Sequence, residues 1–206
     1  MSFKMDWCTN EAAKYAVENW HYSGCMPCGK TVKIGVWEND RFIGCVIFAL
    51  GANPNIASYG GGKACELARI ALTNHKTPVT RIVSIALKML RKHCPNLDSV
   101  ISYADLDRHP GTIYKAGNWK LDGSSTTESF MVIHGKKIHG RTVGNKYGTR
   151  SIEWLRKHVD SKAHKIQTKG KKRFILYFKR AGSKDIVAKS YQGLEDGENP
   201  TSALQE

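Results

Sequence analysis

The 206-residue sequence has no uninterrupted apolar run approaching the roughly 20 residues of a membrane-spanning helix, which excludes an integral helical membrane protein. The stretch Met1–Trp7 also lacks the apolar centre of a secretory signal, so we expect a cytoplasmic protein. Six cysteines are too few for a disulfide-stabilised scaffold of this length, and reduced thiols suit that compartment. The length predicts one compact domain with a sizeable core.

Acidic residues are also scarce, because 18 Asp and Glu residues stand against 32 Lys and Arg residues and the formal net charge is +14. Such a balance predicts a polyanionic partner, and nucleic acid is the obvious class. The excess is concentrated between His134 and Arg173, where Glu153 and Asp160 are the acidic residues. This basic block is either a solvated surface with a disordered loop or a folded element that clamps phosphates.

Apolar residues inside the basic block, Ile152 and Leu155 among them, favour the folded alternative. We therefore expect a basic helical insertion at about 134–173 that binds double-stranded DNA. The residues assigned to DNA contacts are Lys136, Lys137, Arg141, Lys146, Arg150, Arg156 and Lys157. The last stretch, 181–206, is acidic and poor in large apolar residues, which is typical of a flexible tail. A single domain is thus expected over 1–180.

Apolar periodicity, caps and turn residues predict a mixed α/β (α+β) fold in which helices pack on a central sheet. The expected helices cover 11–20 (capped by Thr9 or Asn10), 78–94 and 112–116. The expected strands cover 33–38, 41–48, 66–72, 98–105, 118–121 and 174–178. Asn39–Asp40 is expected to be the turn of a hairpin, and Gly51 to Gly62 a flexible connection.

The second expected helix has Thr77 as its N-cap and Pro78 as its first residue. A helix N-terminus offers unpaired backbone N–H groups and a partial positive charge, which suit a phosphate or pyrophosphate. We therefore assign cofactor binding to Thr77, Thr80 and Arg81.

Arg69 lies among apolar residues of the expected strand 66–72. A guanidinium in such a strand needs an anionic partner. That partner is either a phosphate of a bound donor, which would make Arg69 a cofactor-binding residue, or the carboxylate of Glu66 or Asp105.

The cysteines offer little evidence for a metal centre. Cys25 and Cys28 form a lone C-x-x-C pair, whereas a structural zinc site needs a second pair with similar spacing. The other four cysteines do not supply one. Metal binding is left open, both at this pair and at a site that would use His21 and Asp105.

The order of the expected elements resembles that of the GNAT superfamily of N-acyltransferases, and so does the segment 111–119, with Tyr114 ahead of a turn into a strand. The resemblance implies a mixed central sheet whose donor lies on the helix after the fourth strand. The Gly-rich phosphate loop of that superfamily is replaced here by residues 73–81, which argues against ordinary acetyl-coenzyme A.

Four further segments, in the same order along the chain, carry a closer resemblance. They are 20–27, 66–72, 77–81 and, most specific, Ser-Tyr-Ala-Asp at 102–105 followed by Gly-Thr-Ile-Tyr at 111–114. Over nearly the whole chain up to about residue 180, the sequence resembles the Mom family of Mu-like phages. The resemblance implies transfer of a carbamoylmethyl (acetamido) group to the 6-amino group of adenine in phage DNA, in the cytoplasm of the host. Such a modification would protect the DNA from host restriction enzymes.

With this resemblance, the catalytic candidates are Asp105, Tyr114, His21 and Tyr22. The adenine amino group is a weak nucleophile, so its attack needs a proton acceptor and access to an extruded base. We assign contact with the amino group, or its deprotonation, to Asp105. Tyr114 acts as a general acid or orients the donor, and His21 shuttles protons or ligates a metal. Asp105, Tyr114 and His21 each also have a structural alternative. Asp105 could cap a turn, Tyr114 could be a packed helix residue and His21 could cap a helix.

The implied product constrains the donor. A carbamoylmethyl group attaches to nitrogen through a methylene, whereas plain acyl transfer would attach a carbonyl. Either the donor presents an electrophilic methylene carbon, or the new nitrogen comes from a glycine-like donor that displaces the old one. An acyl-coenzyme A and an aminoacyl-tRNA both suit a GNAT-like donor cleft, and the sequence does not choose between them.

Two other functions are compatible with the sequence. One is a GNAT-like acyltransferase that acts on tRNA or protein, and the other is a non-enzymatic DNA-binding protein, for which the basic block suffices. A DNA-modifying transferase predicts that Asp105→Ala keeps its DNA affinity and loses modification. A DNA-binding protein predicts that the same variant keeps its biological activity.

Overall fold

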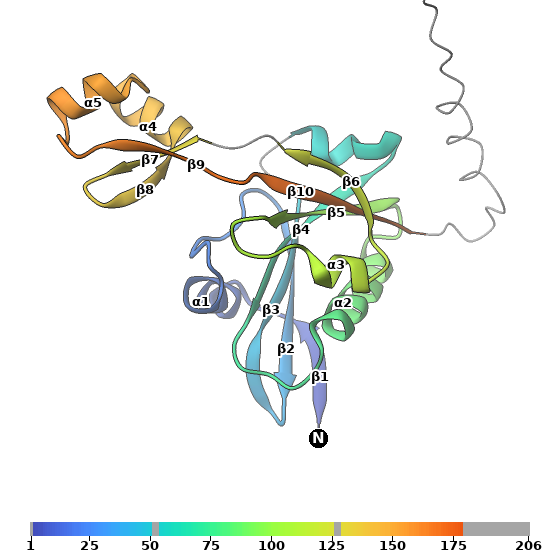
Figure 1. Cartoon of the computed structure of the whole chain (residues 1–206). Coiled ribbons are helices and arrows are strands. Elements are labelled where there is room, and N and C mark those ends of the chain that lie inside the picture. The colour runs from blue at the N-terminus through green and yellow to red at the C-terminus, as the bar shows by residue number, and fades with distance from the viewer. Residues whose placement is uncertain (1, 51–53, 126–128, 179–206) are drawn as a thin grey trace, which may run out of the picture.

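The computed structural model describes residues 2–50, 54–125 and 129–178 of the chain. Its main body is a seven-stranded sheet in the order β1-β2-β3-β4-β5-β10-β6, with helices on both faces (Figure 1). The strands are β1 (Phe3–Trp7), β2 (Thr31–Glu38), β3 (Arg41–Ala49), β4 (Ala64–Leu72), β5 (Ser99–Asp105), β6 (Lys120–Ser125) and β10 (Lys171–Tyr177). The helices are α1 (Asn10–Trp20), the 3-10 helix η1 (Pro54–Gly61), α2 (Val79–His93) and α3 (Thr112–Ala116). This architecture confirms the predicted mixed α/β class.

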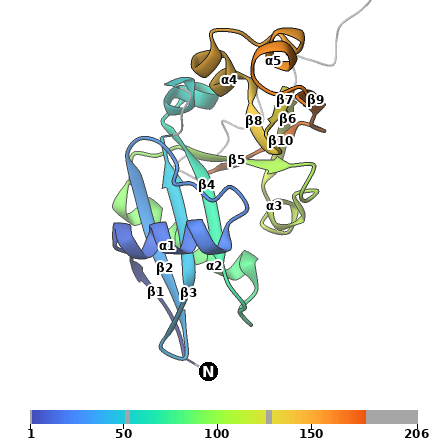
Figure 2. The same cartoon turned by 90° about the vertical axis from the view of Figure 1, so that its left-hand side faces the viewer.

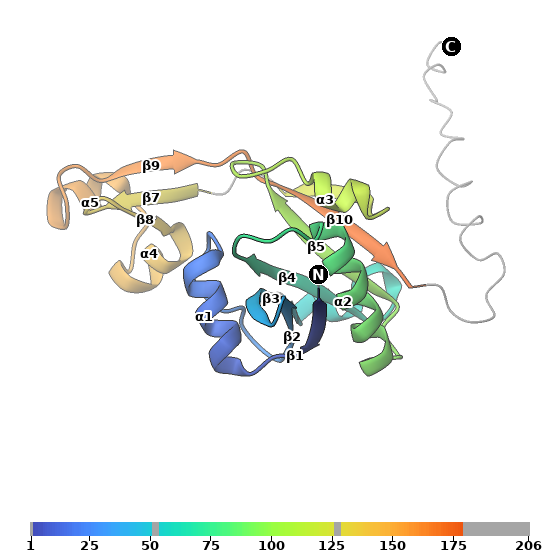
Figure 3. The same ribbon diagram turned by 90° about the horizontal axis from the view of Figure 1, so that it is seen from below.

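The two long helices cover opposite faces of the sheet (Figure 3). α1 packs Ala13 and Val17 against Ile47 of β3, and none of the three side chains is exposed. α2 buries Ile82 and Leu90 in the larger core on the other face. This apolar stripe, repeated every three or four residues, orients each helix.

Local sequence signals correctly predicted two of these elements. α1 begins after Thr9, whose Oγ1 accepts a hydrogen bond from the N–H of Ala12 at 3.2 Å. The β2–β3 hairpin turns at Asn39 and Asp40, whose φ angles of 48° and 60° are the left-handed values of a tight two-residue turn. The edge strand β1, which pairs with β2, was not predicted.

Two expectations about the chain between strands are wrong. The connection from Gly51 to Gly62 contains η1, and Ile56 of this helix is buried against Ile101 of β5. In α2, Pro78 occupies the N-cap position and no side chain caps the helix, so Thr77 is not its N-cap.

Thr77 is instead held by Glu38, the last residue of β2. Glu38 Oε1 accepts from the Thr77 N–H at 2.7 Å, and Oε2 accepts from the Lys76 N–H at 3.0 Å. A hydrogen bond from the Thr77 hydroxyl, together with these two backbone bonds, lowers the pKa of Glu38 to about 2. The carboxylate therefore fixes the entry to α2 from a distant strand.

β4 and β5 separate at a point that we call the fork. They pair in parallel over three residue pairs, the last of which joins Glu66 to Ile101, and then diverge. The ladder between β3 and β4 skips Ala68, which is a β-bulge. Because a bulge bends its strand, β4 turns away from β5 just beyond Glu66.

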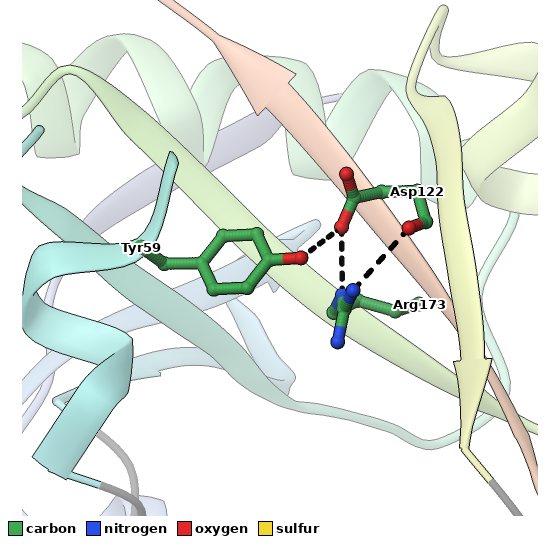
Figure 4. A network of polar contacts seen from close by, with 3 residues as sticks. All are labelled: Tyr59, Asp122 and Arg173. Atoms are coloured by element: carbon green, nitrogen blue, oxygen red, sulfur yellow. Dashed lines mark hydrogen bonds and ion pairs between the residues drawn. The ribbon is translucent and has the colours of Figure 1, made fainter. Parts of the chain in front are cut away.

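A polar network joins η1, β6 and β10 (Figure 4). Arg173 Nε donates to Asp122 Oδ2 at 2.7 Å, and the Tyr59 hydroxyl donates to the same oxygen. The Arg173 guanidinium also lies 4.6 Å from the centre of the Tyr59 ring. β6 and β10 are the strands that lead into and out of the basic block, so the network fixes both to the main body.

The basic block forms a small lobe beyond the end of the main sheet (Figure 2). It consists of a three-stranded sheet and two helices: β7 (Ser129–Ile133), β8 (Lys136–His139), α4 (Gly140–Tyr147), α5 (Ile152–His158) and β9 (His164–Gln167). Met131, Val143 and Leu155 are buried in a core of its own. The expected helices are present, whereas the sheet was not expected, and the lobe runs from 129 to 167.

The expected acidic tail, 181–206, lies outside the described residues. In the part of the chain that the structure describes, no helix has both the length and the apolar character needed to cross a membrane.

Glu38→Gln is expected to lower the melting temperature at neutral pH, because the amide replaces a charged acceptor of three hydrogen bonds. A carboxyl whose folded pKa is depressed stabilises the fold above its unfolded pKa. That stabilisation disappears as pH falls from about 4.5 towards about 2. Thermal unfolding from pH 7 to pH 2 should therefore show the wild type and the variant converging in acid. A difference that does not vary with pH would contradict this role of Glu38.

Candidate functional site

A cavity of about 410 Å³ opens at the fork, and we call it the fork cleft. Its walls come from β4, β5, the first residue of β10, α3 and its approach, and the end of α1 with the loop that follows. Its ionisable and hydroxyl-bearing lining residues are His21, Tyr22, Glu66, Arg69, Ser102, Tyr103, His109, Thr112, Tyr114 and Lys171. The structure thus brings together His21, Tyr22, Arg69 and Tyr114, which the sequence had singled out separately.

Ser102, at the bottom of the fork cleft, links β4 and α3 through hydrogen bonds. Its hydroxyl lies 2.8 Å from the carbonyl oxygen of Leu67 in β4 and 2.8 Å from the hydroxyl of Tyr114 in α3. The carbonyl can only accept, so Ser102 donates its one proton to Leu67 and Tyr114 donates to Ser102. Tyr114 is 5% exposed, and burial raises its pKa to about 12. Its proton is engaged within the protein, which favours the packed, positioning alternative for this residue.

Glu66 is the carboxylate inside the fork cleft. It is the last residue of β4 that pairs with β5, so its side chain lies where the strands diverge. Burial raises the pKa of Glu66, and the positive charges of Arg69 and Lys171 partly offset this effect. A carboxylate with a raised pKa is a stronger proton acceptor than an exposed carboxylate.

The loop after α1 is fastened to β4 by Arg69. The guanidinium donates from Nε to the Cys25 carbonyl at 3.1 Å and from another nitrogen to the Ala68 carbonyl at 2.7 Å. Arg69 thus has backbone partners in addition to the charge of Glu66 nearby. It holds one wall of the fork cleft in place.

His21 is a neutral member of the same loop. Its Nδ1 accepts from the Ser23 N–H at 3.1 Å and lies 2.8 Å from the Ser23 hydroxyl, so the ring proton is on Nε2. Burial, with the positive charges of Arg69 and His109, lowers the pKa of His21 to about 4. A proton shuttle near neutral pH is therefore disfavoured for this residue.

Asp105 ends β5 at the rim of the fork cleft. Its Oδ1 accepts from the Asp107 N–H at 3.1 Å, and its carbonyl oxygen accepts from the N–H groups of Arg108 and His109, both at 2.9 Å. Asp105 thus caps the turn that follows β5, as its structural alternative predicts. This turn places His109 in the fork cleft. The Asp105 carboxylate also lies close enough to Tyr22 to raise the pKa of its hydroxyl, after the larger effect of burial.

The assigned cofactor-binding residues of the α2 region lie in different places. Thr80 lines a second cavity of about 240 Å³ between α2 and α3, which shares Tyr114 with the fork cleft. Thr77 is buried and bonded to Glu38, and the Arg81 guanidinium lies 5.6 Å from the centre of the Phe3 ring. Of these three residues, the structure places Thr80 beside the fork cleft.

The basic lobe carries charge that its own acidic residues do not neutralise. Asp160 accepts from the backbone N–H groups of His134 and Lys162, and Glu153 accepts from the Ser151 hydroxyl, so both carboxylates support local structure. The seven residues assigned to DNA are all exposed: Lys136, Lys137, Arg141, Lys146, Arg150, Arg156 and Lys157. Within the described ranges, none of the seven forms an ion pair with a carboxylate.

The lobe adjoins the rim of the fork cleft. Lys171, the first residue of β10, lines the cleft and pairs with Asp105, and β9 precedes it in the chain. The turn after Asp105 is also bonded to the connection between β9 and β10. Leu106 N–H donates to the Gly170 carbonyl at 3.1 Å, and Lys169 N–H donates to Asp107 Oδ1 at 3.3 Å.

Metal-ligand chemistry finds little support in the part of the chain with described coordinates, where no three His, Cys, Asp or Glu side chains are grouped closely enough to hold an ion. Cys25 and Cys28 are exposed thiols, and neither is in a disulfide.

Among the residues of the cleft and its rim that sequence reasoning missed are Glu66 as a candidate base, His109 and Arg108. A charged residue inside the apolar segment 64–72 is a usable signal; it singled out Arg69, with Glu66 named only as a partner for its charge. The other two lie in the turn after β5, where no pattern indicates which side chain enters a cavity.

Comparison with known proteins finds one similar sequence and several similar folds. The "Methylcarbamoylase mom" of Escherichia phage Mu is 23% identical over an alignment of 191 residues, and the match covers 87% of this chain and 77% of that protein. The solved structure of Arabidopsis thaliana NAA60 with a bisubstrate analogue has a TM-score of 0.52 and 11% identity, covering 86% of this chain and all of that one (100%). An N-acetyltransferase from Staphylococcus aureus Mu50 has a TM-score of 0.49 and 13% identity, covering 86% of this chain and 98% of that one.

The likeness to NAA60 shows the fold alone, which is that of the GNAT acyltransferases. The sequence match is more informative, because the model of the Mom protein family matches residues 2–192. The chain therefore belongs to the Mom protein family.

Proposed function

We propose that the protein is a transferase that adds a carbamoylmethyl (acetamido) group to the 6-amino group of adenine in double-stranded DNA. Family membership and the likeness to the Mu methylcarbamoylase support this. The structural observation that supports it most is the position of the basic lobe, which directly precedes β10 in the chain. The first residue of β10, Lys171, lines the fork cleft. A duplex held on the lobe would have the mouth of the cleft beside it, ready to receive an extruded base. The bulky product would protect phage DNA from restriction enzymes.

In this proposal Glu66 is the proton acceptor. As the adenine N6 attacks, a bond forms between N6 and the methylene carbon of the donor. The bond from that carbon to its leaving group breaks, and its electron pair departs with the leaving group. One N6 proton passes to Glu66, whose raised pKa makes it a stronger base than an exposed carboxylate. Asp105, at the rim, orients the amino group through a hydrogen bond to its carboxylate.

The donor in this proposal occupies the fork and the second cavity, which meet at Tyr114. Beyond the fork, β4 no longer pairs with β5, so this edge of the strand offers backbone hydrogen-bonding groups to a ligand. Thr80 lies along this path. The channel suits an extended donor that carries its leaving group on the methylene carbon of the carbamoylmethyl group.

Glu66→Gln is expected to reduce adenine modification about a hundredfold or more, because a positioned general base contributes about 10²–10⁴-fold. DNA from cells that express each variant is digested, and the carbamoylmethyl adduct of deoxyadenosine is quantified by mass spectrometry. In buffered cell extracts, which supply the donor, the wild-type rate should rise with pH as Glu66 ionises. This acid limb should vanish in Glu66→Gln and persist in Asp105→Asn, whatever the loss of rate in the latter.

Unmodified deoxyadenosine throughout, in cells that contain folded wild-type protein, would overturn the proposed function. A mass increase on tRNA or protein in those cells would indicate the acyltransferase alternative instead. Full modification by Glu66→Gln would leave the DNA target intact and reassign the base to Asp105.

The lobe is expected to bind DNA through phosphates. Replacing Lys136, Lys146 and Lys157 by Gln should weaken binding to any duplex sequence and reduce the slope of log affinity against log salt by about 0.9 for each phosphate that is no longer neutralised. Fluorescence anisotropy of a labelled duplex over a range of salt concentrations measures both effects. Lys92→Gln, an exposed lysine at the end of α2, is the matched control and should leave the slope unchanged. An unaltered slope in the triple variant would contradict the role of the lobe.

A further inference from the structure

Tyr22 is the most exposed aromatic residue that lines the fork cleft. It is 54% exposed, whereas Trp20 and Tyr103 are half-buried and Tyr114 is 5% exposed. It follows the C-cap of α1 and lines the fork cleft. An aromatic face left in water at the mouth of a cavity is a surface on which a planar ligand can stack.

Two side chains, those of His21 and Arg108, lie against the Tyr22 ring. One face stacks on His21, with the ring centres 4.3 Å apart and the planes inclined by 29°. The guanidinium of Arg108 lies 5.5 Å from the ring centre. Arg108 is exposed and belongs to the turn after Asp105. A planar base inserted between Tyr22 and Arg108 needs about 7 Å between the two groups, so a small outward movement of this exposed side chain suffices.

The support beneath Tyr22 is rigid and uncharged. His21 Nδ1 is held by the Ser23 N–H at 3.1 Å, and the His21 carbonyl accepts from the Gly24 N–H at 2.9 Å. Arg69 anchors the same loop through the Cys25 carbonyl. A ring fixed in this way loses little conformational freedom when a ligand stacks on it.

Tyr22 also lies within electrostatic reach of both carboxylates of the site. The charges of Asp105 and Glu66 each act on its hydroxyl group. Glu66 lines the same cavity as Tyr22, and Asp105 ends β5 at its rim, so a base stacked on the ring would face both carboxylates with the edge that carries the exocyclic amino group of adenine.

We propose that Tyr22 is the platform on which the extruded adenine stacks, and that Arg108 closes over the opposite face of the base. This assignment rests on the proposed function, and it makes both residues positioning groups for the base. The ring face of Tyr22 is what matters, so its hydroxyl takes no part in the proton transfer. Arg108 adds a cation–π contact with the base.

The proposal is tested with Tyr22→Leu, Tyr22→Phe and Arg108→Gln in the full chain. Loss of base–aromatic stacking should reduce adenine modification between about fivefold and 150-fold in Tyr22→Leu. Tyr22→Phe keeps the ring and should recover to within about threefold of the wild type, whereas Arg108→Gln should lose about two- to tenfold. Tyr177→Leu, an exposed tyrosine at the far end of β10, is the matched control.

A second measurement needs no donor. An adenine-rich duplex containing 2-aminopurine, a fluorescent adenine analogue, is mixed with each protein under saturating conditions. Stacking on Tyr22 should quench an extruded 2-aminopurine, so Tyr22→Leu should give brighter fluorescence than the wild type at equal duplex affinity. The affinity itself should not change, because the lobe provides the phosphate contacts.

Equal fluorescence and equal modification in Tyr22→Leu and the wild type would contradict the assignment of Tyr22 as the residue on which the base stacks. Equal losses in Tyr22→Phe and Tyr22→Leu would overturn it as well and would assign chemistry to the hydroxyl. If the wild type modifies no adenine, the proposed function fails, and the fluorescence difference still reports separately whether a base stacks on Tyr22.

Discussion

The divergence of β4 from β5 is the constraint on which the rest of the site depends. The bulge at Ala68 turns one strand away, and the Ser102 hydroxyl, bonded to the Leu67 carbonyl and to Tyr114, sets the point where separation begins. The strands and helices that line the fork cleft are arranged around that point. Glu66 lies there because it is the last paired residue of β4. If the two strands stayed paired beyond Glu66, no gap would open between them for a ligand.

Several of the scarce carboxylates in this fold have structural partners that do not belong to the exposed cationic surface of the lobe. Glu38 is occupied by α2, Asp122 by Arg173 and Tyr59, and Asp160 by the backbone of the lobe. The cationic surface of the lobe is therefore not cancelled from within. Glu66 differs from these three because its positive neighbours line a cavity rather than a packed contact.

The sequence predicted the elements whose signals are local and missed those set by distant partners. Thr9 and the Asn39–Asp40 turn act on their immediate neighbours, so α1 and the hairpin were readable. The partner of Thr77 is a carboxylate on another strand, and a capping pattern does not reveal it. β8 was hidden because its first two residues are exposed lysines without the apolar alternation of a strand. For the site, residue types near the cleft were predictable, but the inward direction of Glu66 depends on where two strands separate.

The way the lobe is inserted has a consequence for how such enzymes diversify. β6 and β10 are antiparallel neighbours, and Ser125 at the end of one pairs with Lys171 at the start of the other. The lobe is thus an insertion in the loop of a hairpin, and the two strands of this hairpin pair directly with each other. A loop of different size or polarity could therefore replace the lobe while the strands that line the fork cleft keep their places.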